Sequence, residues 1–468
     1  MKPFLRLLAT ILLTSPVLPQ GAFAEKPNIL FVICDQWRAQ ALGYAGDPNV
    51  QTPHLDNLRH SSIDFVNAVS TIPVCSPARA SLMTGQRALT HGVFINDVQL
   101  SPEADSLGKE LKTAGYDTGY IGKWHLNGDG RFSYIPPERR QGFDYWKVLE
   151  CTHEYNASQY YAGNDPKIQL WKGYDAIAQT TDACQYLRDH ANSGKPFCLF
   201  VSFGPPHDPY FLAPDEYKVK YQAGSIKLRA NVPQAAAFRA RTCATGYYAN
   251  CTALDDCVGR LLGTLDEIHA TENTIVVFTA DHGDLLGSHN YYEKQQPYDE
   301  SIRIPLLLHW PKGLGVAGKM LDAPFAPEDF MPTLLDLCNL PIPKTVQGLN
   351  FGAYVRGGAN PSDDAAIISC VTPFGAWNRS RGGKEYRGIR TTRYTYVRDL
   401  KGPWLLFDDQ VDPYQMKNLV NNPEFAKLQA ELDAKLTQKL KQNGDEFQPG
   451  EIYLKKWSYP ANEKGSSK

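Results

Sequence analysis

The chain of 468 residues has no long apolar run, no excess of either charge and no repeated or low-complexity segment. A membrane-spanning helix needs about 20 consecutive apolar residues, and the apolar runs here are shorter. Lysine plus arginine total 48 and aspartate plus glutamate 50, which leaves a formal net charge of −2. Because the net charge is close to zero, the protein as a whole does not attract anions electrostatically. Any anion must therefore be recognised by a local group of side chains. We therefore expect neither nucleic-acid binding nor stable insertion into a membrane.

A disulfide framework is also absent from the sequence. The ten cysteines are irregularly spaced in a long chain, whereas disulfide scaffolds are short. Cys34, Cys198 and Cys338 stand within apolar runs, where a buried free thiol is the ordinary explanation. The pairing of the other cysteines stays open at this point.

The N-terminus has the three parts of a secretory signal. Lys2 and Arg6 stand near the start, residues 7–13 are apolar, and residues 22–24 read Ala-Phe-Ala. A basic end, an apolar centre and a small-x-small site are typical of a signal that is cleaved. We expect residues 1–24 to be this signal, with a retained anchor as the alternative. The mature protein would then be periplasmic or secreted.

Continuous apolar runs predict the strands of a central sheet, at residues 27–34, 197–203, 274–279 and 305–310. Continuous rather than alternating apolar residues suit strands that are buried on both faces, as in a parallel sheet. Helical spacing of apolar residues appears between them, at residues 107–114 and 180–191. The pattern predicts an α/β fold with a large, mostly parallel sheet and helices on both faces.

The composition changes after about residue 345. Glycine and proline become frequent, strand-like pieces follow at residues 366–371, 387–391 and 394–399, and residues 423–442 form an amphipathic helical pattern. A small antiparallel sheet with one packed helix is expected. Because a single core stops growing at about 250–300 residues, we divide the mature chain into a large domain, residues 25–350, and a small α+β subdomain, residues 351–468.

Three of the apolar runs are followed by polar pairs, which are Asp35-Gln36, His207-Asp208 and Asp281-His282. In parallel sheets, ligands gather beyond the carboxyl ends of the strands. These side chains are therefore the first candidates for a functional site.

The stretch from Cys75 to Arg79 reads Cys-Ser-Pro-Ala-Arg and predicts the start of a helix. Pro77 is comfortable in the first helical turn, where its missing N–H is not needed. Cys75 would then stand at the helix N-terminus, where free N–H groups and the helix dipole favour an anion. Arg79 lies one turn further on, on the same face. The alternative is a cysteine at a helix cap beside a solvated arginine.

Cys-x-Pro-x-Arg followed by Ala-Ser-Leu-Met-Thr-Gly resembles the signature of the type I formylglycine-dependent sulfatases, in the alkaline phosphatase superfamily. The resemblance extends along nearly the whole mature chain. It implies an alkaline phosphatase-like fold and a Cys75 that a formylglycine-generating maturation enzyme oxidises to 3-oxoalanine (formylglycine). The hydrated aldehyde would be the nucleophile, because its second hydroxyl lets the enzyme release sulfate by re-forming the aldehyde.

Two strand ends resemble the family's metal-binding segments. The resemblance implies that a divalent cation is held by Asp35, Gln36, Asp281 and His282. Many family members have a second Asp where this chain has Gln36, and Asn where it has His282; both residue types present here can ligate. A set rich in oxygen ligands suits a hard cation, with calcium first and manganese or magnesium as alternatives.

Further matches complete the implied catalytic set. Lys123, in Gly-Lys-Trp-His, would steady the formylglycine and the sulfate, and His125 would take a proton as the sulfated intermediate collapses. On an extended segment these two side chains point to the same face. His207 would protonate the departing alcohol oxygen, and Lys294 would bind the sulfate. The resemblance thus implies these catalytic residues: Cys75, Arg79, Lys123, His125, His207 and Lys294.

The implied function is a sulfuric ester hydrolase that releases inorganic sulfate from a sulfated carbohydrate. Export suits such a substrate, and the aromatic-rich residues 155–171 could stack on sugars or simply pack in the core. A phosphodiesterase or phosphonate monoester hydrolase of the same superfamily is one alternative, which Gln36 and His282 favour slightly. A catalytically silent protein that binds sulfated glycans is another, and the complete catalytic set argues against it.

Two groups of cations have no role in this set. Arg139 and Arg140 indicate a solvated pair, with contact to an anionic sugar as the alternative. The other group would select the substrate if the small subdomain packs over the site, and consists of Arg381, Lys384, Arg387 and Arg390.

Overall fold

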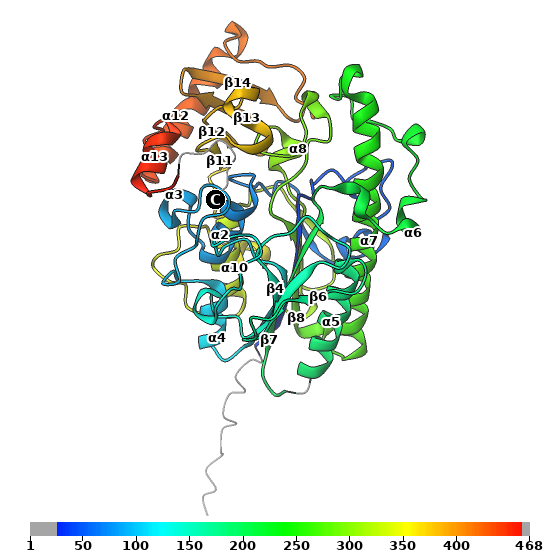
Figure 1. Ribbon diagram of the computed structural model, residues 1–468. Coiled ribbons are helices and arrows are strands. Elements are labelled where there is room, and N and C mark those ends of the chain that lie inside the picture. The colour runs from blue at the N-terminus through cyan, green and yellow to red at the C-terminus, as the bar shows by residue number, and fades with distance from the viewer. Residues whose placement is uncertain (1–25, 192, 461–468) are drawn as a thin grey trace, which may run out of the picture.

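The computed structural model describes residues 26–191 and 193–460 (Figure 1). The expected signal, residues 1–24, lies outside this part, so its prediction stays open. Within the described ranges, no helix combines the length and the apolar character needed to cross a membrane.

A ten-stranded sheet forms the centre of the molecule. Its strands, in spatial order, are β10 (Lys319–Leu321), β2 (Ile63–Phe65), β9 (Leu306–His309), β8 (Thr274–Ala280), β1 (Asn28–Asp35), β7 (Phe197–Pro206), β3 (Asp117–Lys123), β4 (Tyr145–Leu149), β5 (Gln159–Ala162) and β6 (Gln169–Leu170). The five strands from β8 to β4 run parallel to one another. Their carboxyl ends therefore meet along one edge of the sheet.

The apolar runs predicted as strands are strands, but one runs the other way. Every residue of β7 and β8 is buried, which is why their sequences are continuously apolar. Strand β9 is equally buried yet pairs antiparallel with both β8 and β2. The expectation that this run joins the parallel set is therefore wrong, because a continuous apolar run reports burial on both faces and not strand direction.

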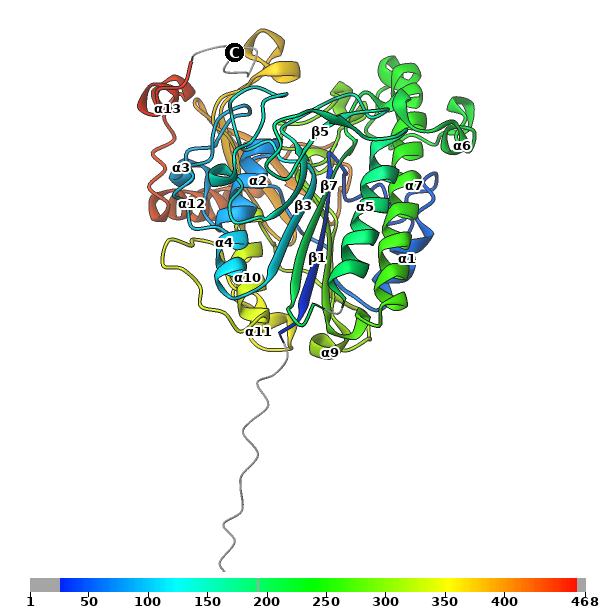
Figure 2. The same ribbon diagram turned by 60° about the horizontal axis from the view of Figure 1, so that its bottom comes forward.

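Helices cover both faces of the sheet (Figure 2). One face carries α2 (Cys75–Thr84), α4 (Leu107–Thr113) and α10 (Phe330–Leu337), and the other carries α1 (Pro53–Arg59), α5 (Asp175–His190) and α7 (Ala237–Glu267). The remaining helices in the large part are short and are α3 (Ala88–His91), α6 (Asp215–Lys218), α8 (Asp299–Ile302), α9 (Pro311–Leu314) and α11 (Gly352–Val355). This is the layered α/β architecture that the sequence predicts.

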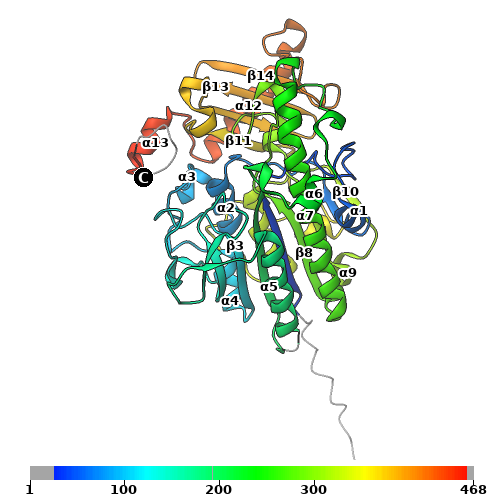
Figure 3. The same cartoon turned by 45° about the vertical axis from the view of Figure 1, so that its right-hand side comes forward.

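A second, antiparallel sheet lies beside the carboxyl edge of the large one (Figure 3). It consists of β11 (Ala366–Cys370), β12 (Tyr386–Arg390), β13 (Tyr394–Asp399) and β14 (Gly402–Asp408), followed by α12 (Ala426–Gln442) and α13 (Gly450–Lys456). Helix α12 buries Leu432, Leu436 and Leu440 at four-residue spacing against this sheet. The small α+β unit was expected, and β14 is an additional strand. The domain boundary at residue 350 stays a prediction.

Candidate active site

The candidate residues come from the ends of parallel strands. Asp35 ends β1, Lys123 ends β3, His207 follows β7 and Asp281 follows β8. Helix α2 begins at Cys75, and its first-turn residue Ser76 donates its backbone N–H to Asn96 Oδ1 at 3.0 Å. The structure thus brings the predicted strand-end residues to one edge, together with the N-terminus of α2.

Four polar atoms surround the Cys75 sulfur, which has no exposed surface. His282 Nε2 lies at 3.3 Å and Lys294 Nζ at 3.4 Å. Asp35 Oδ1 lies at 3.5 Å and Lys123 Nζ at 3.7 Å. Cations, a carboxylate and an imidazole therefore converge on one side chain at a helix N-terminus, where an anionic nucleophile would be stabilised.

A group of possible metal ligands shares this position. One ligand atom each from Asp35, Cys75, Asp281 and His282 lie within 4.8 Å of one another, and all four residues are buried. His282 Nδ1–H donates to the carbonyl of Gly283 at 3.0 Å, which leaves Nε2 facing the group. Burial lowers the pKa of His282, so the ring is neutral, as a metal ligand must be. The donor set fits a divalent cation.

Gln36 lies next to this group and presents its side-chain oxygen to Lys294. Its backbone is left-handed, at φ 66°, and its Oε1 accepts from Lys294 Nζ at 2.9 Å. Its Nε2 donates to Asp284 Oδ2 at 2.7 Å. That carboxylate, which also accepts from the Tyr210 hydroxyl, holds the amide so that the oxygen faces Lys294. Asp284 was not predicted as functional, although it stands three residues after Asp281 in the same segment.

Arg79 and Lys123 neutralise the carboxylates. Arg79 donates to Asp281 at 2.9 Å and to Asp35 at 3.3 Å, and its guanidinium also bonds Ser202 Oγ at 2.7 Å. Lys123 donates to the Asp35 carboxylate. Burial opposes ionisation of Asp35, yet the neighbouring positive charges, Lys123 foremost, hold its pKa well below the usual range. The aspartate is therefore a carboxylate, ready to ligate a cation.

Both ring nitrogens of His207 are engaged in hydrogen bonds. Lys294 Nζ donates to His207 Nε2 at 2.7 Å, and His207 Nδ1–H donates to the Asp208 carbonyl at 2.8 Å. Burial, and then the charge of Lys294, place the pKa of His207 well below its usual value. The imidazole of His153 stacks on this ring with a centroid distance of 4.7 Å. His207 is thus neutral here. Its Nε2 accepts from Lys294 Nζ, which itself lies beside the Cys75 sulfur.

His125 does not continue the strand that precedes it. Strand β3 ends at Lys123, and His125 has a left-handed φ of 61°, so the expected extended alternation of these two residues is wrong. Its Nε2 lies 3.0 Å from Asp97 Oδ1. Asp97 was not singled out in the sequence, because its partner is 28 residues away and no local pattern joins the two.

Several of the unassigned cations have structural partners. Arg140 is buried with its guanidinium 5.2 Å from the ring centre of Trp146, so the expected solvated pair is wrong for this residue. Arg387 is fully buried and pairs with Asp445, and Arg390 pairs with a carboxylate at the start of α8. Arg387 and Arg390 therefore attach the small sheet to its surroundings.

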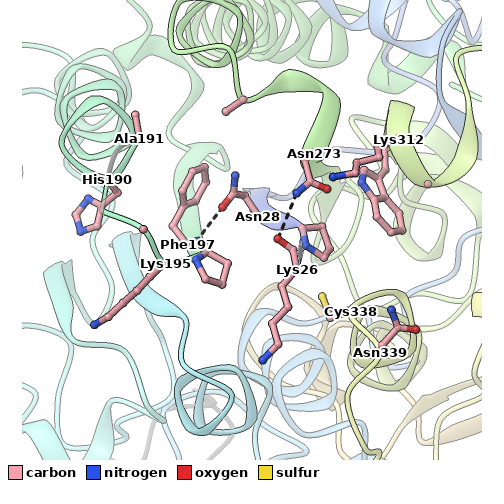
Figure 4. Close-up of a pocket in the computed structure, with 16 residues that line it drawn as sticks. Lys26, Asn28, His190, Ala191, Lys195, Phe197, Asn273, Lys312, Cys338 and Asn339 are labelled. Carbon is pink, nitrogen blue, oxygen red and sulfur yellow. Dashed lines mark hydrogen bonds between the residues drawn. The ribbon is translucent and has the colours of Figure 1, made fainter. Parts of the chain in front are cut away.

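A cavity of about 860 Å³ lies at the opposite edge of the large sheet (Figure 4). Asn28 at the start of β1, Phe197 at the start of β7 and Asn273 just before β8 line it. Its Lys26 donates to the carbonyl of Ala114 at 2.8 Å. None of the predicted site residues reaches this cavity, since they lie at the carboxyl ends of the same strands.

A mostly parallel sheet with a buried nucleophile and an oxygen-rich ligand group at its carboxyl edge defines a hydrolase of the alkaline phosphatase-like class. The comparisons with known proteins name the family. The sulfatase family model matches residues 27–340, and the C-terminal model of N-sulphoglucosamine sulphohydrolase matches residues 287–442. The chain belongs to the sulfatase family, and the predicted family, fold class and hydrolase activity are confirmed.

Relatives match over most of their length. The chain is 45% identical over 436 residues to an ulvan-active sulfatase of Formosa agariphila, covering 93% of this chain and 85% of the relative. It is 32% identical to an endo-4-O-sulfatase of Bacteroides thetaiotaomicron, covering 85% and 88%. A solved structure from glycosaminoglycan metabolism in that bacterium superposes with a TM-score of 0.80 at 28% identity, covering 93% and 99%. Family membership implies a divalent metal and formylglycine, which the buried ligand group fits.

Proposed function

We propose that the chain is an exported enzyme that releases inorganic sulfate from a sulfated polysaccharide or oligosaccharide, with the residue formed from Cys75 as nucleophile. The observation that carries this proposal is the convergence of His282, Lys294, Asp35 and Lys123 within 3.7 Å of the Cys75 sulfur. A sulfate ester is an anion that water attacks slowly, so an enzyme has to neutralise charge around a strong nucleophile.

The ligands of the cation would be Asp35, Gln36, Asp281 and His282, and we take calcium as the first choice because most donors are oxygens. When bound, the cation polarises a sulfate oxygen and lowers the pKa of the nucleophile's hydroxyl, while formylglycine, made from Cys75 by a maturation enzyme, supplies that hydroxyl. Manganese and magnesium are the alternatives.

The protein's own side chains would divide the remaining work. Arg79 and Lys123 hold the carboxylates of Asp35 and Asp281 in place and offset negative charge. Lys294 lies 3.4 Å from the nucleophile position and would offset charge on the sulfate oxygens. His207 is neutral in this structure, and the negative charge of a bound sulfate ester would favour protonation of its Nε2 from solvent. The ring would then give this proton to the departing alcohol oxygen, since its Nδ1–H is already engaged by Asp208.

The substrate class follows from the relatives and from the expected export signal. The ulvan-active relative is similar across 93% of this chain, so a sulfated polysaccharide such as ulvan is the first substrate we propose. The N-terminal signal pattern supports a periplasmic or secreted enzyme. Such an enzyme would have access to polysaccharides outside the cytoplasm.

The test is release of free sulfate from a panel of sulfated glycans, beginning with ulvan and glycosaminoglycans. The protein is coexpressed with a formylglycine-generating enzyme, and peptide mass spectrometry confirms conversion of Cys75. Release that disappears in Cys75→Ala supports the proposal. No release despite confirmed conversion would transfer the assignment to phosphodiesters or phosphonate monoesters, tested next with the same preparation.

A further inference from the structure

A buried hydrogen bond joins the side chains of Asp97 and His125. His125 Nε2 lies 3.0 Å from Asp97 Oδ1, and the two side chains are 2% and 11% exposed. The neighbouring residue, Asn96, accepts the backbone N–H of Ser76 at the start of α2. One short segment therefore binds both the helix that carries Cys75 and the imidazole.

The carboxylate of Asp97 is held ionised. Burial opposes this, but the hydrogen bond from His125, followed by its charge and that of Arg131, lowers the pKa of Asp97 to about 2. Arg131 lies 3.3 Å from the second carboxylate oxygen. An ionised carboxylate can only accept, so the hydrogen between Asp97 and His125 belongs to Nε2.

The other ring nitrogen faces a different environment. His125 Nδ1 is buried, and no hydrogen-bond partner is present for it among the described residues. Asn96 and Asp97 bind Ser76 and His125, so the ring lies near the start of α2. Burial and the charge of Lys123 lower the pKa of His125, but the hydrogen bond to Asp97, followed by interaction with Cys75, raises it above its usual value. With Nε2 protonated, the lone pair of the neutral ring is on Nδ1, the nitrogen left to serve the nucleophile.

We propose that Asp97 is a positioning residue that holds His125 in the Nε2–H tautomer, with the Nδ1 lone pair directed at residue 75. The catalytic role of Asp97 rests on the proposed function. Both residues have left-handed backbones, with φ 59° for Asp97 and 61° for His125. Such conformations are unfavourable for residues with a side chain and persist where the surroundings impose them, as at functional sites.

The direct test is nitrogen NMR of histidine side chains at pH 8, in protein with unmodified Cys75. The 15N-labelled ring of His125 is identified by its loss in His125→Gln. We expect protonation on Nε2 and none on Nδ1 in the wild type. In Asp97→Asn, whose side-chain amide can donate to the ring, the Nδ1–H form should appear. A wild-type ring protonated on Nδ1 overturns the proposal, and this measurement needs neither metal nor activity.

The kinetic test uses converted enzyme and a matched control. The control is Asp182→Asn, which also removes a mostly buried, paired aspartate. Asp182 lies on α5 and contacts Lys147 and Tyr145 of β4. Asp97→Asn should lower kcat by about 10²-fold or more, as expected for a wrong tautomer, with KM changed by less than about threefold. Equal kcat in the two variants would overturn the proposal. An inactive wild type would count against the proposed function alone, because the NMR result stands separately.

Discussion

The hydroxyl of Tyr386, on the second strand of the small sheet, donates a hydrogen bond of 2.8 Å to the backbone carbonyl of Gln295. Gln295 follows Lys294, and its side-chain amide bonds the backbone of Phe374 in both directions. Glu293 and Gln295, on either side of Lys294, both have left-handed backbones, with φ 62° and 83°. The small sheet thus fixes the segment that presents Lys294 to the site.

Replacing Tyr386 by phenylalanine should weaken substrate binding. Losing one buried hydrogen bond costs about 1 kcal/mol, and here the loss falls on the position of Lys294. We expect KM for a sulfated substrate to rise by about fivefold, with a smaller change in kcat. Tyr396→Phe removes a hydroxyl that bonds Asp433 on α12 instead, and is the matched control. A similar KM in both variants would show that the Tyr386 hydrogen bond does not position Lys294.

Replacing Asp284 by asparagine should weaken metal binding. The new amide would place a donor opposite Gln36 Nε2 and turn the Gln36 oxygen away from the centre. Groups that orient metal ligands typically contribute about 10–100-fold in affinity, and a loss of that size is expected. Calorimetric titration of calcium into metal-free protein measures it, with Asp433→Asn as control. Unchanged affinity in Asp284→Asn would remove Gln36 from the ligand set.

The rate lost in His207→Ala should depend on the leaving group. A poor alcohol leaving group needs the proton that His207 would supply, whereas an activated phenol does not. We expect the loss in kcat/KM to be about 10²-fold for a sugar sulfate and much smaller for an activated aryl sulfate. His153→Gln, at the ring stacked on His207, tests for simple loss of packing. Equal losses on both substrates would exclude His207 as the general acid.

His91 should make the fold sensitive to acid. Its Nδ1 accepts the backbone N–H of Val93, its Nε2–H donates to Ser81, and burial lowers its pKa to about 3. In the unfolded chain His91 titrates near pH 6.5. As the pH falls, the unfolded chain therefore takes up a proton at His91 before the folded protein does. Stability is therefore lost as pH falls below about 6.5, by up to about 1.4 kcal/mol per pH unit.

The measurement is thermal unfolding of wild type and His91→Gln between pH 7.5 and 5. EDTA is present throughout, so that protonation of metal ligands does not contribute. The wild-type Tm should fall more steeply with decreasing pH than that of the variant. Parallel curves would show that His91 is not a source of the pH dependence.

Local patterns in the sequence account for much of the fold. The continuous apolar runs of β1, β7 and β8 and the helix start at Cys75 were predicted correctly, because burial on both faces and a first-turn proline leave short-range signatures. The sulfatase family followed from the signature around Cys75 and from motifs spread along the chain. The direction of β9 was not predictable, because direction depends on chain connections and not on apolar content.

The sequence alone determined the family, the α/β class and the candidates for catalysis, since each depends on residue type and short spacing. Only the tertiary structure decided which groups touch. Asp97 meets His125, Asp284 meets Gln36 and Tyr386 meets Gln295 across 28, 248 and 91 residues. Contacts at such separations leave no periodic trace in one sequence, because folding brings them together through the packing of the sheets rather than through neighbouring residues.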